Sequence, residues 1–184
     1  MGMSRDFHSE GESVMTTSPE LLVDAFGRIR EIVNGLVDGL TADQLIFRLD
    51  DDANSIAWLI WHLTRVQDDH VAELAATEQV WTSGGWSDRF GLPFPPSSTG
   101  YGHSSSDVAA VRGVSSQLLA GYSDAVHAHT IQFVGRLNDS DLGRIVDIAW
   151  TPPVTLGARL ISVIADDLQH VGQAAFIEGV LRRR

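Results

Sequence analysis

Two residues near the C-terminal end, Asp166 and His170, have the types and the spacing of a metal-ligand pair. They lie four residues apart in the segment 155–181, whose apolar residues recur at helical spacing. Residues four apart on a helix are stacked neighbours, so the carboxylate and the imidazole would share one face. The rest of that face is apolar, and an unpaired carboxylate is costly to bury. The spacing therefore favours a metal ion or a protonated histidine as the partner of Asp166.

A third candidate ligand, His62, lies in an earlier segment with the same helical periodicity, residues 56–75. Helical bundles build metal sites from inward-facing side chains of different helices. Two imidazoles and one carboxylate suit zinc, nickel or ferrous iron, with coordination positions left open for water or substrate. Any catalysis would then proceed through a metal held by His62, Asp166 and His170.

The same three residues also have plain structural explanations. Asp166 could form a buried ion pair with Arg159, about two turns earlier on the same predicted helix. His170 could be a core histidine that a neighbouring polar group satisfies. Spacing alone leaves the metal site and these alternatives open.

Two further residues are candidates for binding a cofactor or substrate. Gln173 follows His170 by three residues and lies on the flank of the same stripe. Trp58 lies one turn before His62 in the earlier segment. Packing between helices would explain both residues equally well.

The remaining titratable candidates are weaker. Asp68 and Asp69 could orient a metal ligand, although a solvated acidic face is the simpler explanation. His70 could face the interior, and so could His129 as a fourth ligand or general base, although a satisfied buried histidine is the simpler explanation for His129. His103, in a glycine-rich stretch, could lean over the pocket, whereas we expect His8 and His127 to lie in solvent.

Four long amphipathic segments must position these residues. Ser18 before Pro19 marks the start of the first segment, and the Thr41 to Gln44 spacing of a capping box indicates a short helical turn after it. No strand-rich region or internal repeat is evident, although residues 144–150 could be extended. We therefore predict an all-α four-helix bundle. The predicted long helices cover residues 18–40, 56–75, 104–137 and 155–181.

The connection between the second and third predicted helices, residues 77–104, is long and rich in aromatic residues and proline. Connections of this length in compact domains are more often functional than decorative. We predict a flap packed over one end of the bundle, and a hydrophobic plug with no substrate role is the alternative.

Composition limits the partners of the protein. The 184 residues fit one domain, predicted over 18–184, after a flexible segment 1–17. The net charge of -11 disfavours nucleic acid and anionic membranes, which need clustered basic residues. All thirteen basic residues are arginine, and no cysteine is present, so any thiol would come from a cosubstrate. The polar N-terminus has no apolar core of a signal peptide, so we expect a cytoplasmic protein.

Two stretches, NSIAWLIWHL at 54–63 and DDLQHVGQ at 166–173, resemble the second-helix and fourth-helix signatures of the DinB-like superfamily. More narrowly, they are similar to the metal-binding domain of mycothiol-dependent maleylpyruvate isomerases and to mycothiol S-transferases. The resemblance implies a divalent metal, usually zinc, held by His62, Asp166 and His170. It departs from the family at Asp166, where the first ligand of the fourth helix is usually Glu or His.

The resemblance implies a metal-dependent S-transferase or isomerase that adds a thiol such as mycothiol to a small electrophile. An arginine-only basic set is compatible with a GC-rich, actinobacterial source. Dimers are common in the family, so a homodimer is one expected state. The alternative is a stress-related helical-bundle protein, metal-binding or metal-free, without enzyme activity.

Overall fold

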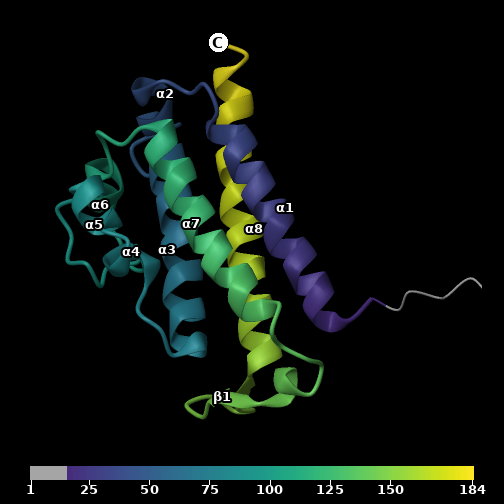
Figure 1. Cartoon of the computed structure of the whole chain (residues 1–184). Coiled ribbons are helices and arrows are strands. Elements are labelled where there is room, and N and C mark those ends of the chain that lie inside the picture. Colours follow the sequence, from purple (N-terminus) through teal and green to yellow (C-terminus); the bar gives the residue numbers. More distant parts are fainter. Residues whose placement is uncertain (1–15) are drawn as a thin grey trace, which may run out of the picture.

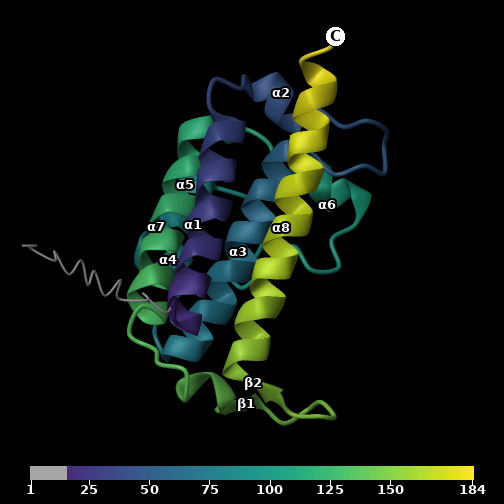
Figure 2. The same ribbon diagram turned by 90° about the vertical axis from the view of Figure 1, so that its right-hand side faces the viewer.

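The computed structural model describes residues 16–184, so the predicted flexible segment 1–17 lies almost entirely outside the described residues, as does His8. Four long helices form the predicted bundle (Figure 1). Helices α3 and α1 each pack against both α7 and α8, so α1 and α3 lie at opposite corners. Figure 2 shows the same four helices from the side. Their bounds are α1 Ser18–Val37, α3 Ile56–Ala75, α7 Ser116–Val134 and α8 Leu156–Leu181.

Helix α1 begins at Ser18, as predicted, but the residue that caps it differs from the expected one. Thr17, and not Ser18, is the N-cap: its side chain accepts a hydrogen bond from the Glu20 backbone N–H, and the Glu20 carboxylate accepts one from the Thr17 backbone N–H. This reciprocal capping box satisfies two backbone donors that a helix start leaves unpaired. The helix ends at Val37, three residues before the predicted end at Leu40.

The other predicted helix starts are confirmed. Thr41 and Gln44 form a capping box for the short helix α2, Ala42–Ile46. Ser55 caps α3 by accepting from the Trp58 backbone, and Thr155 caps α8 in the same way. Local capping chemistry therefore sets where the helices that carry His62, Asp166 and His170 begin.

The predicted third helix is wrong in its first third, because the chain forms two helices there. Helix α6, Ser105–Ala110, ends before Gly113, which has a positive φ of 76°. Glycine adopts that conformation without the steric cost that other residues would incur. Ser115 then caps α7, with its hydroxyl accepting from the Leu118 backbone. The helical spacing of the apolar residues continues across this break, so periodicity alone did not indicate it.

A short hairpin precedes α8. It consists of β1, Ile145–Asp147, and β2, Val154–Thr155, which pair antiparallel with Ile145 opposite Thr155. A 3₁₀ turn, Asp141–Gly143, leads into it. The prediction of extended structure over 144–150 is therefore confirmed only for its first half. No helix within residues 16–184 is long and apolar enough to cross a membrane.

The 77–104 segment lies along the side of α3 and α7, and not over one end of the bundle as predicted (Figure 1). It contains two short helices, α4 Val80–Ser83 and α5 Trp86–Phe90. Three of its aromatic side chains are buried against Tyr122 of α7. The ring centroids of Trp81, Trp86 and Phe90 lie 5.1, 5.6 and 5.8 Å from that of Tyr122. Aromatic packing therefore makes this segment part of the hydrophobic core.

A fully buried ion pair within α3 holds both ends of the 77–104 segment. Arg65 and Asp68, each with a side-chain exposure of 0%, lie 3.4 Å apart. Asp68 accepts hydrogen bonds from the backbone N–H groups of Val80 and Trp81 and from the Tyr122 hydroxyl. The expectation that Asp68 lies on a solvated face is therefore wrong.

The Arg65 side of this pair binds the far end of the segment. Its guanidinium donates to the backbone carbonyls of Pro96 and Ser98 and to the side-chain oxygen of Gln79. A buried charge pair contributes stability only when its remaining donors and acceptors are also satisfied, and here they are. One turn of α3 thus anchors the segment near residue 80 and again near residue 98.

Replacing Arg65 by methionine tests this anchor. We expect Arg65→Met to lower the free energy of unfolding by about 3–5 kcal/mol, because it leaves the Asp68 carboxylate buried without its counter-ion. Urea denaturation followed by circular dichroism measures the change. Arg28→Met is the matched control, since Arg28 forms an exposed pair with Asp24 and should change stability little. Equal effects of the two substitutions would contradict the structural role of Arg65.

Candidate metal centre

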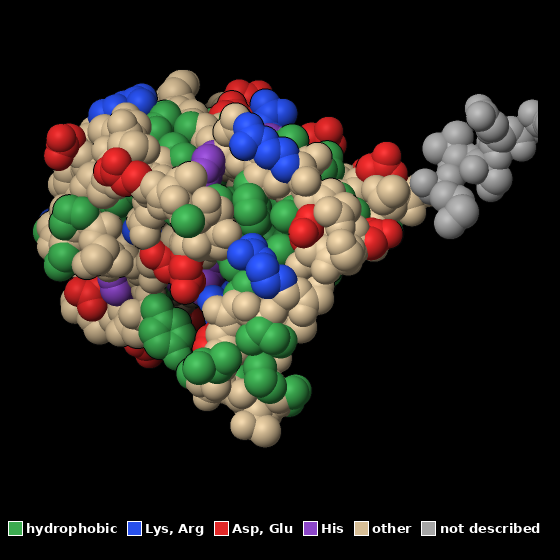
Figure 3. All heavy atoms as spheres, turned by 60° about the horizontal axis from the view of Figure 1, so that its bottom comes forward, with side chains coloured by type: hydrophobic (Ala, Val, Ile, Leu, Met, Phe, Trp, Pro, Cys, Tyr) green, Lys and Arg blue, Asp and Glu red, His purple; other side chains and the backbone are tan. Residues whose placement is uncertain are grey.

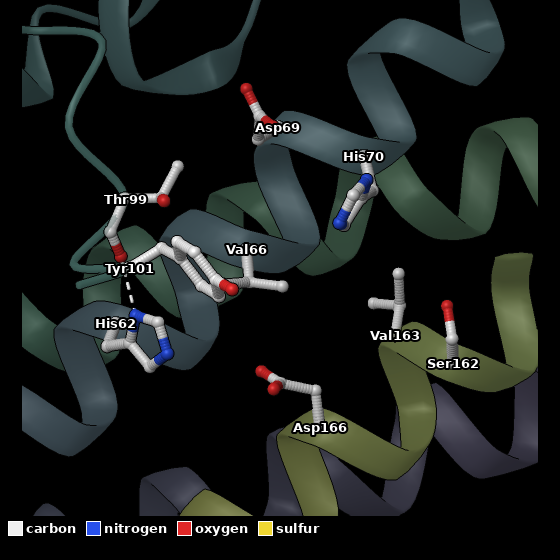
Figure 4. Close-up of a pocket in the computed structure, with 9 residues that line it drawn as sticks. All are labelled: His62, Val66, Asp69, His70, Thr99, Tyr101, Ser162, Val163 and Asp166. Carbon is white, nitrogen blue, oxygen red and sulfur yellow. Dashed lines mark hydrogen bonds between the residues drawn. The ribbon is translucent and has the colours of Figure 1, made fainter. Parts of the chain in front are cut away.

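Side chains of α3 and α8 converge at one point between the helices. One ligand atom each from His62, Asp166 and His170 lies within 4.8 Å of the other two. Asp166 and His170 stack one turn apart on α8, with 3.5 Å between Asp166 Oδ1 and His170 Nε2. Figure 4 shows His62 and Asp166 facing each other across the gap between the two helices. The structure therefore brings together the three residues that the sequence singled out.

His62 is fixed in one orientation by the 77–104 segment. Its Nδ1 lies 2.5 Å from the carbonyl oxygen of Thr99. A carbonyl can only accept, so Nδ1 carries the proton and the Nε2 lone pair is left for a ligand. The ring also stacks on Trp58, with the centroids 4.5 Å apart. Burial lowers the pKa of His62, and this favours the neutral imidazole that a metal requires.

The contact with Thr99 depends on the glycine that follows it. Gly100 has a φ of 94°, and a Cβ built on it would lie 2.7 Å from His62 Nδ1 and 3.0 Å from the Trp61 ring. A side chain at this position would be strained by its backbone conformation and would also collide with the imidazole. Only glycine lets the segment approach His62 this closely.

Asp166 and His170 influence each other's protonation: the Asp166 carboxylate is negatively charged, and His170 holds a proton that a metal ion could displace. A hydrogen bond with Asp166 raises the pKa of His170 above its ordinary value. Burial works to raise the pKa of Asp166, but its hydrogen bond with His170 and the nearby histidines lower it overall. His170 Nδ1 also donates to Gln173 Oε1 at 3.4 Å, and this leaves Nε2 directed at Asp166.

The donor set fits a divalent metal ion. The second oxygen of Asp166, Oδ2, is buried and has no hydrogen-bond partner among residues 16–184. Such an atom is costly to leave unpaired, and a cation would satisfy it. Arg159 does not do so, because it pairs with Asp147 at 2.8 Å and with Glu73 at 3.6 Å. The alternative expectation of an ion pair between Asp166 and Arg159 is therefore wrong.

A cavity of about 460 Å³ opens beside these ligands. Helices α3 and α8 form two of its walls, and Thr99 and Tyr101 of the 77–104 segment form a third (Figure 4). Tyr101 is 94% exposed, so its ring lies at the mouth. Figure 3 shows acidic, basic and histidine side chains close together on the face near the hairpin. The lining residues are His62, Val66, Asp69, His70, Thr99, Tyr101, Ser162, Val163 and Asp166.

The two candidate cofactor-binding residues hold imidazoles in place. Trp58 stacks on His62 and donates through Nε1 to His103 Nδ1 at 3.2 Å, while Gln173 accepts from His170. Neither residue lines the cavity. A role for Trp58 or Gln173 in cofactor binding stays a prediction.

Two of the weaker histidine candidates lie away from the ligands. His103 packs behind the site against Trp61, 5.7 Å between centroids, so the expectation that it leans over the pocket is wrong. His129 lies 3.1 Å from the Thr77 hydroxyl and lines a different, smaller cavity, which removes it as a fourth ligand. His127, expected in solvent, is half-buried on α7, and burial lowers its pKa.

Sequence reasoning missed the residues of the 77–104 segment that complete the site. Thr99 acts through its backbone carbonyl, so its side-chain type carried no signal. The run Gly100-Tyr101-Gly102 was the available clue, because two glycines around an aromatic residue indicate a tight backbone approach. Asp69 was singled out, and it lines the cavity, with Oδ1 accepting from Gln79 at 2.6 Å.

Comparison with known proteins agrees with the fold. A family model described as the DinB superfamily matches residues 25–174. A solved structure of a conserved protein from Enterococcus faecalis is 26% identical, with a TM-score of 0.85, over 92% of this chain and 100% of that chain. No curated protein matches. The family match spans the positions of His62, Asp166 and His170, and neither match bears on a thiol cosubstrate.

Replacing Gly100 by alanine tests how the site is assembled. The added methyl group would push the Thr99 carbonyl away from His62 Nδ1, releasing the ring from its required orientation. We expect zinc affinity to fall about 10- to 100-fold, the usual effect of losing a group that orients a metal ligand. Isothermal titration calorimetry measures the affinity.

Gly102→Ala is the matched control for this experiment. Gly102 also has a positive φ, 75°, but nothing lies within 4 Å of a Cβ built on it. The two variants share a similar backbone strain and differ in the collision with His62. Equal zinc affinities for Gly100→Ala and the parent would show that the close approach does not matter.

Zinc affinity should also depend on pH in a defined direction. The raised pKa of His170 means that its proton is retained to a higher pH than in an ordinary histidine, so an ion must displace it. Affinity should therefore fall by about tenfold per pH unit as pH drops below that pKa. Calorimetric titrations between about pH 6 and pH 8 measure this slope. A constant affinity across that range would contradict the assignment of His170 as a ligand.

Proposed function

The chain belongs to the DinB superfamily, and we propose that it is a metal-dependent thiol transferase or isomerase. In this proposal His62, Asp166 and His170 hold one divalent metal ion. A small-molecule thiol, of which mycothiol is the expected type, is added to a small electrophile in the cavity beside them. Zinc is the ion we propose, and nickel or ferrous iron accept the same ligands.

One observation carries this proposal: three potential ligand atoms lie within 4.8 Å of one another, and two of their residues, His62 and Asp166, line a cavity of about 460 Å³. A structural metal site is closed by four protein ligands, whereas a catalytic site keeps a position open. Three protein ligands beside a cavity have the second arrangement. The cavity is also within the range of volumes that small-molecule sites occupy.

The chemistry follows from what the ligands and the cavity provide. A bound divalent ion would supply the positive charge that keeps a coordinating thiol deprotonated. His62 and His170 present Nε2 toward the ligand position because Thr99 and Gln173 occupy their Nδ1 atoms. The chain has no cysteine, so the thiol must come from a cosubstrate, and no internal thiol competes with it.

The surroundings of the cavity favour a small-molecule reaction over a nucleic-acid partner. Val66 and Val163 give it apolar walls, and Tyr101 partly covers the opening. The two valines would limit the contact of a reacting thiolate with water, and water exclusion strengthens the electrostatic interactions within a site. The net charge of -11 supports the same conclusion, because phosphate backbones need a basic surface.

A metal-free bundle protein is the second candidate, and one observation favours it. Asp166 and His170 lie 3.5 Å apart and shift each other's pKa in the directions expected of an ion pair. The two residues could therefore satisfy each other without a metal. This candidate leaves Asp166 Oδ2 unpaired within the described part of the chain.

Metal content measured on purified variants separates the two candidates. We expect close to one zinc ion per chain in the parent protein, and a loss of affinity of about 100-fold or more in His170→Ala and Asp166→Ala. Elemental analysis after dialysis against zinc gives the content. His129→Ala is the control, because it removes a histidine outside the site and should keep the metal.

The reaction itself is tested by thiol consumption. The zinc-loaded parent should accelerate the addition of mycothiol to small electrophiles, and a chelator should remove that acceleration. Absence of metal in the parent would favour the metal-free bundle. Full metal loading without any acceleration would leave a metal-binding protein and exclude the transferase.

A further inference from the structure

Helix α8 is uncharged on the side that faces solvent. Every exposed residue along it, from Ala158 to Phe176, is apolar or carries a neutral polar group. Three of them are large, since Ile161, Leu168 and Phe176 are 57%, 47% and 62% exposed. A surface helix normally turns charged residues to water, and a helix that is apolar on all sides is normally buried. The composition of α8 therefore indicates that something covers its outer face.

The neighbouring helix α1 extends this face. It packs against α8, and Figure 2 shows the two helices side by side. Leu21 and Ile32, three turns apart on the same side of α1, are exposed. Arg28 between them pairs with Asp24 of the same helix, so that pair adds no net charge. The combined face is about 30 Å long and about 20 Å wide. Standard interfaces bury about 800 Å² per partner, which is an area of this order.

An apolar groove of about 320 Å³ lies between the first turns of α1 and α8. Leu21 and Ala25 line it from α1, Ile161 and Ile164 line it from α8, and Leu142 closes it from the 3₁₀ turn. Ser18 is the one polar residue among those that line it. Water is readily displaced from such a groove by an apolar side chain.

The projecting ring of Phe176 and this groove are placed so that two copies of the chain fit each other. Phe176 follows Ile161 by fifteen residues, or about 22 Å, with Leu168 near the midpoint. If a second α8 runs antiparallel across a two-fold axis at Leu168, each Phe176 reaches the groove beside Ile161 of the other copy. Both contacts form at once, and the assembly closes with two copies.

Small residues near the midpoint allow two helices to approach closely. Ala165 and Gly172 flank Leu168 on the outer side of α8. A Cβ built on Gly172 would meet nothing within 4 Å, so the bundle itself does not require glycine there. Glycine inside a helix is destabilising. A closely packed second helix, whose Leu168 enters the space above Gly172, gives this glycine a reason.

The charge of the chain also favours a second copy as the partner. Two chains of net charge -11 repel each other, and this repulsion opposes association least at a face without charge. The outer side of α8 has that property. A basic partner would find no exposed carboxylate along α8, and an acidic partner would find no exposed arginine.

We propose that two copies of this chain form a dimer through the outer faces of α8 and α1, with the two α8 helices antiparallel. Leu168 lies at the centre, and Phe176 of each copy occupies the groove beside Ile161 of the other. Asp166 and His170 converge with α3 on the other side of α8, so the dimer leaves the candidate metal centre open. The dimer is therefore independent of the proposed reaction.

Sedimentation velocity of the full chain measures the dimer and its dissociation constant. Ile161→Glu should raise that constant about 100-fold or more, because a symmetric interface would bury the new charge twice. Ile148→Glu is the matched control. Ile148 is 84% exposed and follows Asp147, which pairs with Arg159 on the α3 side of α8, so the dimer should persist. Circular dichroism checks that each variant is folded. Equal dissociation constants for the two variants would overturn the proposal.

Cross-linking tests the antiparallel orientation, because the chain has no cysteine and a single introduced one reports its own position. Gln169→Cys lies near the midpoint, so a short bismaleimide should join it to its counterpart in the other copy. Ala175→Cys should not be joined to its counterpart, because antiparallel helices place the two about 20 Å apart. Efficient cross-linking of Ala175→Cys would indicate parallel helices and would overturn the proposal.

Salt gives an independent readout on the parent protein. Added salt should lower the dissociation constant, because it screens the repulsion between the two negative chains and breaks no ion pair at the interface. A dimer that weakens with salt would overturn the uncharged interface. A parent protein that sediments as a monomer at every concentration would also overturn the proposal, and would leave this face to a different protein or to the segment before residue 16.

Discussion

The buried ion pair between Arg65 and Asp68 is the constraint on which the site depends. It binds the 77–104 segment at two places, near residue 80 through Asp68 and near residue 98 through Arg65. Because Arg65 lies one turn after His62, the second attachment delivers Thr99 directly to the imidazole of His62. A surface connection thereby becomes a fixed wall of the cavity.

Three histidines at or beside the cavity have the same arrangement: a neighbouring group forms a hydrogen bond with Nδ1, and Nε2 stays free to contact a ligand or substrate. A carbonyl sets the tautomer of His62, an amide oxygen sets that of His170, and Arg159 sets that of His70. The first two partners accept and the third donates, so the outcomes are opposite. Two rings offer lone pairs toward the ligand position, and one offers a proton toward the substrate space.

Local chemistry made the bundle and the positions of the three ligands predictable. Caps such as Thr155 and the spacing between Asp166 and His170 are encoded within a few residues, and His62 was predicted from its place in a second amphipathic helix and again from the family resemblance. Features that depend on distant contacts were not predictable. Asp68 has the composition of a solvated face, yet it is buried because backbone groups twelve residues away reach it. The break before α7 was hidden because apolar residues continue through it.

Because of the close approach at Gly100, the orientation of the His62 ring and the docking of the 77–104 segment on α3 depend on each other. The contact between Thr99 and His62 exists only while the 77–104 segment is seated on α3. By thermodynamic reciprocity, whatever free energy the docked segment adds to ion binding, a bound ion must add to the docking of the segment. An ion held between α3 and α8 would therefore stiffen a part of the chain that never touches it through a side chain. Metal supply would then act on the shape of the substrate space as well as on its reactivity.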